Sequence, residues 1–470
     1  MKDGRRRVLA IAASVIATAV VIPVATADSP PGTAAPQAAQ SAHHFQRSRN
    51  FLQLYASQQA PTTADCEVAF QVACYAPFQF HKAYRLNQLF GRGLNGKGRT
   101  IAIVDSFGSP TIAADLAQFD ADFGLPAPPQ LRVIHPAGAP PPFDPTDDDM
   151  VGWAYETTLD VEWAHALAPG AKILLVETPN SETEGLTGIP EIVRSENYVI
   201  NHNLADVISQ SFGATEETFP SYSSIYGQRS AFTNAEQNGV SVLAASGDSG
   251  PTDYQLDLEH LYTTPVVGWP SSDPLVTSVG GTQLHLDATG NRTAPDNVWN
   301  DSFNPNVAGP EPQAIATGSG DSHAFVRAFY QDPVRRQVGG ARGAADVSMS
   351  AACDGGVLVY VGFTTDENGY HVICGTSEAT PEFSAIVAIA NQAAGRRLGN
   401  LNPALYDLGQ QGAKGLVDVT QGDNTVTFTQ DGQTYTIPGS QARPGYDMAS
   451  GNGTINANAL VNELARRSGR

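Results

Sequence analysis

The most informative stretch of this chain is Cys374-Gly375-Thr376-Ser377-Glu378-Ala379-Thr380-Pro381, which has the pattern of a helix start. The Gly-Thr pair places Ser377 at the beginning of an apolar helix that runs through Phe383 and Ile389. At a helix start, backbone N–H groups and the helix dipole favour negative charge, so an oxyanion could form beside this hydroxyl. A serine that only caps the helix is the alternative interpretation of the same pattern.

Strand-like and helix-like segments alternate through the first half of the chain, and the alternation predicts a parallel, doubly wound α/β sheet. In such a sheet, ligands bind at the carboxyl ends of the strands. The predicted strands are Thr100–Val104, Lys172–Val176, Asp206–Ile208, Val240–Ala245 and Leu275–Val279, and the predicted helices are Ile112–Phe123, Trp153–Leu167 and Tyr222–Asn238.

The amino-terminal segment is typical of an exported protein. Residues 1–27 hold basic side chains, an apolar run and an Ala-Thr-Ala end, so we expect a signal peptide that is cleaved before Asp28. No later apolar run is long enough to span a bilayer, so we expect no membrane segment. Residues 28–74 form an Ala/Pro-rich lead-in, and residues 75–466 have the composition of one large globular domain.

Charge and cysteine content narrow the class of protein further. The formal charge of −20 argues against nucleic acid as a partner, and a surplus of carboxylates suits a protein that works in acid. Cysteines of exported proteins form disulfides, so the local pairs Cys66–Cys74 and Cys353–Cys374 are predicted, although three pairings are possible in principle. We expect a monomer.

Two segments carry carboxyl groups that could do chemistry. Glu156 and Asp160 lie four residues apart on one predicted helix face, where buried carboxyls would share a proton and one could act as a base near about pH 4 to 5. A solvated acidic face is the alternative. Asp248 follows a predicted strand on a tight Ser-Gly-Asp-Ser-Gly turn, either for its local backbone hydrogen bonds or as a protonated donor to an oxyanion.

Other aspartates could bind a cation. Asp418 and Asp447 lie in glycine-rich segments, where carboxylates and main-chain carbonyls suit Ca²⁺, although turn formation explains them equally well. Residues 147–149 are a run of three aspartates that could also bind a cation, but we expect an exposed loop tip there.

Taken in order, these motifs resemble the sedolisin family of serine-carboxyl peptidases. The motifs are E-x-x-x-D at Glu156, S-G-D-S-G at Asp248, G-T-S-x-x-x-P at Ser377, D-V-T at Asp418 and G-Y-D at Asp447, and the resemblance covers roughly residues 75–465. Supporting stretches include Ser209-Gln210-Ser211-Phe212-Gly213 and Val279-Gly280-Gly281-Thr282.

The resemblance implies a subtilisin-like three-layer fold and a peptidase that attacks polypeptides through an acyl-enzyme on Ser377. It implies that Glu156 is the general base, that Asp160 orients it, and that Asp248 is the oxyanion donor. It also implies one structural Ca²⁺, held by the side chains of Asp418 and Asp447 and by the carbonyls of Val419, Arg443 and Gly445. No cofactor would take part in the chemistry, and endopeptidase action is expected over tripeptidyl-peptidase action.

Three departures from the family pattern accompany the resemblance. Only about 45 residues separate the expected cleavage site from the resembling region, too few for the large folded propeptide of family members. Tyr446 stands where the family commonly has Trp, and residues 318–322 match the usual glycine-rich serine motif only loosely.

Two competing interpretations remain at this stage. A subtilisin of the Ser-His-Asp type would use Asp105, but its base would have to be His165, which we expect to be packed among apolar residues. A secreted, catalytically inactive binding protein on the same fold is the second alternative. An acid optimum for peptide hydrolysis would exclude both.

Overall fold

The computed structural model describes residues 56–57, 59–364 and 368–467. The expected signal peptide and most of the expected lead-in lie outside these residues. Within the described residues, no helix has both the length and the apolar character needed to cross a membrane.

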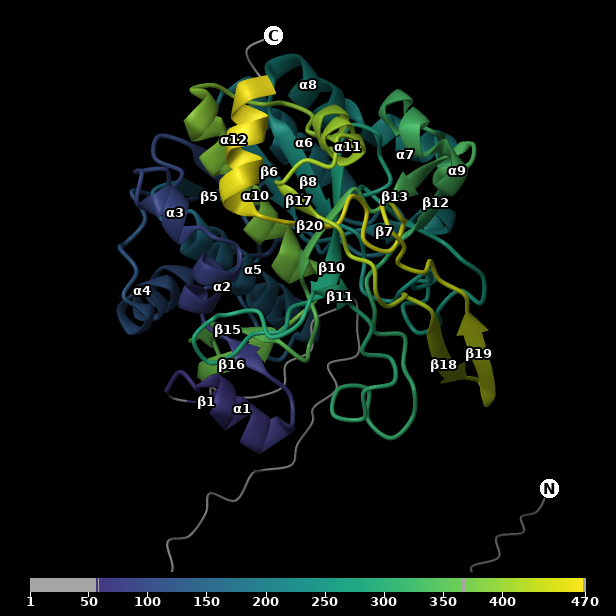
Figure 1. The fold of residues 1–470 in the computed structure, drawn as a ribbon, viewed down its shortest axis with the longest axis horizontal. Helices are drawn as coiled ribbons and strands as arrows, with labels where there is room; N and C mark the ends of the chain where they lie inside the picture. The colour runs from purple at the N-terminus through teal and green to yellow at the C-terminus, as the bar shows by residue number, and fades with distance from the viewer. Residues whose placement is uncertain (1–55, 58, 365–367, 468–470) are drawn as a thin grey trace, which may run out of the picture. The chain divides into compact units, whose positions relative to one another are not determined.

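A mostly parallel sheet forms the centre of the fold (Figure 1). Its strands run in the order β11-β10-β8-β6-β3-β5-β4, with β14 beside β10, and the short edge strand β11 is antiparallel to β10. The sheet contains β3 Thr100–Ser106, β4 Leu131–Ile134, β5 Lys172–Thr178, β6 Val207–Gln210, β8 Ser241–Ala245, β10 Thr277–Gln283, β11 Asn297–Val298 and β14 Val347–Ser350.

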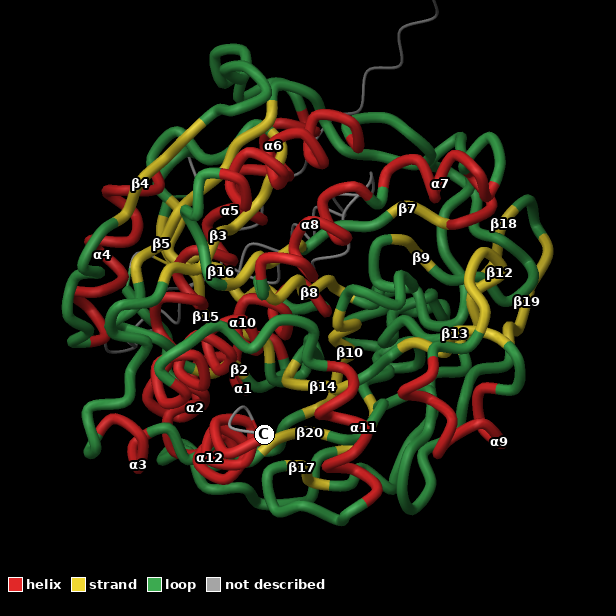
Figure 2. Tube along the Cα trace, turned by 90° about the horizontal axis from the view of Figure 1, so that it is seen from above, coloured by secondary structure: helices red, strands yellow, loops and turns green. Residues whose placement is uncertain are grey.

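Helices cover both faces of this sheet (Figure 2). The helices of the described residues are α1 Thr63–Phe70, α2 Pro77–Ala83, α3 Asn87–Phe90, α4 Ile112–Phe123, α5 Asp148–Leu167, α6 Ile189–Asn201, α7 Tyr222–Gln228, α8 Ser230–Asn238, α9 Arg335–Val338, α10 Thr376–Ala394, α11 Asn402–Gln410 and α12 Ala457–Arg467. Of these, α5 and α10 pack on one face of the sheet, and α6 and α8 pack on the other. Side chains along a strand alternate between two faces. In β3, Ile101 and Ile103 join the core formed with α5 and α10, whereas Ala102 and Val104 join the core formed with α6 and α8. The predicted three-layer, subtilisin-like arrangement is therefore confirmed.

A second sheet packs at the side of α4 and α5, in the order β1-β16-β15-β2. Its strands are β1 Ala56–Ser57, β2 Cys74–Tyr75, β15 Gly356–Val361 and β16 Gly369–Ile373. The remaining strands form two-stranded pairs: β7 Ala214–Thr215 with β9 Gly268–Trp269, β12 Gly320–Val326 with β13 Ala341–Ala344, β17 Leu416–Val417 with β20 Thr454–Ile455, and β18 Val426–Gln430 with β19 Gln433–Ile437.

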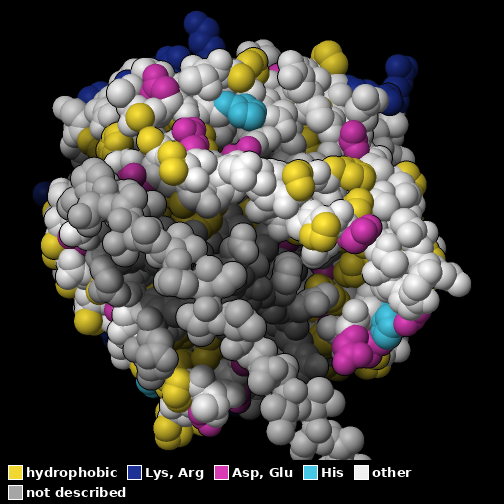
Figure 3. Space-filling view, turned by 90° about the horizontal axis from the view of Figure 1, so that it is seen from below, with side chains coloured by type: hydrophobic (Ala, Val, Ile, Leu, Met, Phe, Trp, Pro, Cys, Tyr) yellow, Lys and Arg dark blue, Asp and Glu magenta, His cyan; other side chains and the backbone are white. Residues whose placement is uncertain are grey.

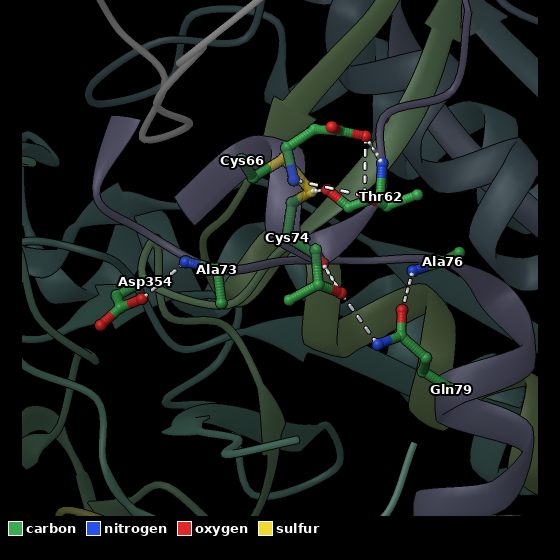
Figure 4. Close-up of a disulfide and its surroundings, with 9 residues drawn as sticks. Thr62, Cys66, Ala73, Cys74, Ala76, Gln79 and Asp354 are labelled. Carbon is green, nitrogen blue, oxygen red and sulfur yellow. Dashed lines mark hydrogen bonds between the residues drawn. A yellow bond between two sulfur atoms is a disulfide. The ribbon is translucent and has the colours of Figure 1, made fainter. Parts of the chain in front are cut away.

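The folded region begins earlier than the predicted domain start at residue 75. Helix α1 begins after Thr62, whose side chain accepts a hydrogen bond from the Asp65 N–H, and Cys66 and Cys74 are buried in the main core (Figure 4). Both predicted disulfides, Cys66–Cys74 and Cys353–Cys374, are present. The first joins α1 to β2, so this part of the expected lead-in belongs to the packed structure.

Two other local predictions need correction. The predicted helix Tyr222–Asn238 is divided into α7 and α8 at Arg229, whose guanidinium pairs with the buried carboxylate of Asp273. The predicted loop tip at residues 147–149 is the start of α5: the Asp147 carboxylate accepts from the Asp149 and Met150 N–H groups. Acidic side chains are favourable at that end of a helix dipole.

Acidic side chains are spread over the face of the molecule drawn in Figure 3, and Lys and Arg side chains lie mainly along its upper rim. This distribution accords with the formal charge of −20.

Candidate active site

Ser377 lies in the first turn of α10, the helix in contact with the central strands and α5. The helix begins at Thr376, and the position before it is taken by Gly375 with a φ of 125°. Glycine adopts such a conformation without steric cost, which lets the chain turn sharply from Cys374 into the helix. Ser377 is buried and does not occupy the N-cap position. The interpretation of Ser377 as a simple cap is therefore wrong.

Glu156 and Asp160 lie inside the protein on α5, 1% and 0% exposed. The solvated-face alternative is therefore wrong. Burial raises the pKa of Asp160 well above its usual value, and the negative charges of Asp105 and Glu156 raise it further. The carboxyl of Asp160 is thus a group that holds its proton.

The hydroxyl of Ser211 connects the carboxyls of α5 to the nucleophile helix. Ser211 follows β6, its Oγ donates to Oδ1 of Asp160 at 2.9 Å, and the same Oγ lies 3.4 Å from the carbonyl oxygen of Ser377. In the sequence, Ser211 stands out only as part of a stretch that supports the family resemblance. Its position directly after a central parallel strand was the signal that could have marked it as a site residue.

Asp248 lies beside Thr376 and is positioned by it. Oδ1 of Asp248 accepts hydrogen bonds from the backbone N–H of Thr376 at 2.7 Å and from its hydroxyl at 2.6 Å. Burial raises the pKa of Asp248 to about 7. Oδ2 is buried and has no hydrogen-bond partner among the described residues. A protonated Oδ2 would be free to donate a hydrogen bond to a group bound next to Ser377.

A pocket of about 700 Å³, its open mouth included, brings Ser377 and Asp248 together. We call it the Ser377 pocket. Glu156 and Asp160 do not line it. It is lined by Glu182, Thr183, Glu184, Ser211, Phe212, Gly213, Ala245, Ser246, Gly247, Asp248, Asp253, Tyr254, Leu258, Gly268, Thr376 and Ser377.

The geometry gives no support to a Ser-His-Asp triad. Nε2 of His165 lies 2.8 Å from the carbonyl oxygen of Pro126 and 3.1 Å from Oδ1 of Asp120 on α4. No histidine is among the described residues that line the Ser377 pocket. Asp105, near the end of β3, acts electrostatically on Asp160.

The predicted calcium ligands Asp418 and Asp447 are close neighbours. The N–H of Gly445 donates to Oδ2 of Asp418 at 2.9 Å, and the N–H of Arg443 donates to Oδ2 of Asp447 at 3.0 Å. Burial raises the pKa of Asp447, and the charge of Asp418 adds to the shift. Two repelling carboxylates on glycine-containing loops fit a hard cation with oxygen ligands.

The described residues contain no group of three or more His, Cys, Asp or Glu side chains for a metal, so main-chain carbonyls would have to complete such a site. The assignment to Val419, Arg443 and Gly445 stays a prediction.

The sequence of the chain matches the model of the subtilase family over residues 149–405. The chain therefore belongs to the subtilase family. It is 34% identical to kumamolisin of Bacillus sp. strain MN-32 over 389 residues, which cover 81% of this chain and 62% of that protein. It is 27% identical to sedolisin of Pseudomonas sp. strain 101 over 76% of this chain and 56% of that protein. The predicted resemblance to the sedolisin family is confirmed by these relatives.

A solved structure has the same fold. Pseudomonas sedolisin, described as a serine-carboxyl proteinase complexed with two molecules of pseudo-iodotyrostatin, matches with a TM-score of 0.67 and 24% identity, covering 84% of this chain and 99% of that one. The chain is also 30% identical to human tripeptidyl-peptidase 1 over 56% of its length and 43% of that protein. It thus spans about half the length of the curated relatives that it matches.

Proposed function

We propose that this chain is an exported, acid-active serine-carboxyl peptidase that cleaves within polypeptides. The observation that carries the proposal is the arrangement of Asp248 beside Ser377: a buried carboxyl with a pKa of about 7, one oxygen fixed by Thr376, and the other left without a partner among the described residues. Such a group can donate a proton in hydrogen bonding only below neutral pH. The relatives supply the class of reaction.

The proposed reaction proceeds through an acyl-enzyme. Oγ of Ser377 attacks the scissile carbonyl carbon while Glu156 accepts the Oγ proton, and Asp248 donates a hydrogen bond to the resulting oxyanion. Collapse breaks the C–N bond, and the proton on Glu156 passes to the leaving amine. Water then attacks the ester, Glu156 accepts a proton from it, and Ser377 regains its hydroxyl hydrogen as the acid product leaves. Asp160, held by Ser211, orients Glu156.

The pH dependence of this reaction follows from two opposite requirements. Glu156 must be ionised, so activity falls at low pH; Asp248 must be protonated, so activity falls as the pH rises through about 7. The test is hydrolysis of a denatured protein from pH 2 to 9 by the wild type and by Ser377→Ala. We expect an acid optimum and a loss of at least about 10⁴-fold in the variant. A neutral or alkaline optimum, or full activity in Ser377→Ala, would contradict the proposal.

Two further features belong to the proposal. Internal fragments among the products would support endopeptidase action, and release of amino-terminal tripeptides alone would contradict it. Asp418 and Asp447 would hold one Ca²⁺, which when bound neutralises two carboxylates and ties their loops together. A calcium chelator should then lower the Tm of the wild type and leave that of Asp447→Asn unchanged, and equal responses would argue against the site.

A further inference from the structure

The Ser377 pocket contains acidic side chains that the proposed reaction does not use. Glu182, Glu184 and Asp253 line it together with the nucleophile, and no Lys, Arg or His is among the described residues of its lining. Glu182 and Glu184 are 4% and 8% exposed. Buried carboxyls with no cation nearby are costly, which makes them candidates for binding a positively charged ligand group.

The chain fixes the positions of two of these carboxyls. Oε2 of Glu184 accepts from the N–H of Thr215 at 2.7 Å and from the hydroxyl of Thr218 at 2.9 Å. Oδ1 of Asp253 accepts from the N–H of Tyr254 at 2.9 Å. Such hydrogen bonds orient the carboxyls before any ligand arrives, so little ordering is needed on binding.

The location of the pocket indicates which part of a substrate enters it. Its walls come from the segments that follow β6 and β8, Ser211–Gly213 and Ala245–Asp248, and it includes both Ser377 and Asp248. A carbonyl that is attacked by Ser377 and hydrogen-bonded by Asp248 would therefore have its own residue's side chain directed into this space. An added Cβ on Gly247 would lie only 3.6 Å from Oδ2 of Asp253, so this carboxyl lies next to the turn that presents Asp248.

The other lining side chains suit a long cationic side chain. Phe212, Tyr254 and Leu258 offer apolar surface for an aliphatic stem, and Glu184 and Asp253 offer oxygens for its charged end. Arg and Lys have this division into stem and head, and an acidic group in the pocket next to a serine nucleophile is how trypsin selects them.

We propose that the Ser377 pocket selects substrates with Arg or Lys at the residue whose carbonyl is attacked, with Glu184 and Asp253 binding the cationic group. This inference rests on the proposed peptidase function and names its substrate class. Selectivity would come from the paired acids, because their carboxyls, already hydrogen-bonded to the chain, gain a cationic partner only when a basic side chain binds.

A pH dependence of selectivity follows from the same groups. Burial raises the pKa of Asp253 to about 6, and burial and the charge of Asp253 raise that of Glu184 well above its usual value. Glu182 also raises the pKa of Glu184, and the pair in turn raises the pKa values of Asp248, Tyr254 and Tyr262; none of these groups is cationic. The empty pair is protonated in acid, so a bound cation must displace protons. Preference for Arg should therefore grow as the pH rises from about 3.5 to 6.

The test compares two peptides that differ only in Arg or Leu on the acyl side of the scissile bond. For the wild type at pH 5.5 we expect kcat/KM to favour the Arg peptide, with a larger ratio than at pH 3.5. Glu184→Gln and Asp253→Asn should each lower kcat/KM for the Arg peptide by about 30-fold or more and change that for the Leu peptide little. Glu196→Gln, which alters a buried carboxyl bonded to Gln210 and not lining the pocket, is the matched control.

The outcomes separate this inference from the proposed function. Hydrolysis of the Leu peptide as fast as the Arg peptide by wild type, or an unchanged Arg/Leu ratio in both pocket variants, would overturn the selectivity while leaving the peptidase intact. Hydrolysis of neither peptide would count against the function itself. If the variants fail to fold, the inference can still be tested on the wild type alone. Benzamidine, but not benzyl alcohol, should inhibit cleavage of the Leu peptide, and the inhibition should be stronger at pH 5.5 than at pH 3.5. Equal effects of the two compounds would overturn the inference.

Discussion

Helices α5 and α10 pack against each other, and each carries two buried carboxyls four residues apart. On α5 these are Glu156 and Asp160, and on α10 they are Glu378 and Glu382. Burial raises the pKa of Asp160, Glu378 and Glu382 well above their usual values. By spacing and burial the two pairs are therefore alike.

Their surroundings differ. The α5 pair is connected to the nucleophile segment through Ser211, which contacts both Asp160 and the carbonyl oxygen of Ser377. On α10, Glu378 lies beside Ser350 and feels the charge of Asp248, and Glu382 acts on the phenol of Tyr84. None of the four lines the Ser377 pocket. Burial and helical spacing are thus common to both pairs, and only the connection of the α5 pair to Ser377 suggests a role in catalysis.

Exchanging one carboxyl in each pair for its amide tests this distinction most directly. Glu156→Gln removes the proposed base, so kcat/KM should fall by about 10²- to 10⁴-fold. Glu382→Gln removes a carboxyl of the same burial that has no proposed role, and activity at the acid optimum should change by less than about threefold. Equal losses in the two variants would show that both pairs serve only the structure of the helix contact.

A smaller effect is expected at Asp248, which is hydrogen-bonded to Thr376 at the start of α10. Asp248→Ala removes the oxyanion donor and should lower kcat by about 10²- to 10³-fold. Asp248→Asn retains an N–H donor that does not titrate, so it should be more active than Asp248→Ala. The wild-type decline through about pH 7, where Asp248 loses its proton, should be weaker in Asp248→Asn. The pH profiles of kcat for the three proteins provide the measurement, and an identical decline in Asp248→Asn would assign the alkaline limb to another group.

Much of this site could be predicted because it lies at the ends of periodic elements. The central strands are continuous apolar runs in the sequence because both of their faces are buried. Ser377 and Asp248 could be located because each lies at the end of a helix or strand that the sequence pattern predicts. Helix α6 was not predicted, although its apolar residues share one face, which packs on β3 and β5. The short strands β1 and β2 were also missed, since their partners β16 and β15 lie far away in the sequence.

Contacts between distant segments could not be read from the sequence at all. Asp105 was considered only for a triad with a histidine, and its neighbour proved to be Asp160 because β3 and α5 pack together. Glu184 and Asp253 reach one pocket from loops that are separated in the sequence by strands β6 and β8, and neither residue belongs to a motif. Such residues are recognised by the pocket that they share, which appears only once the chain is folded.

The smallest expected effect concerns the stability of the α10 pair. Glu382 has a raised pKa in the folded protein, because burial and the charge of Glu378 disfavour its carboxylate. Between its unfolded pKa and its higher folded pKa, the folded state binds more protons than the unfolded state, so this group makes stability fall as the pH rises above about 4.5. Glu382→Gln removes the titrating carboxyl and keeps the shape of the side chain. The Tm of the variant relative to the wild type should therefore increase by a few degrees between pH 3.5 and pH 7, which corresponds to about 1 kcal/mol in the free energy of unfolding.

The exposed carboxyl change Glu259→Gln is the control, with no such trend expected. Should the Tm difference for Glu382→Gln stay constant across this range, the pair on α10 would not hold its proton differently from an unfolded carboxyl, and its likeness to the pair on α5 would be limited to spacing and burial.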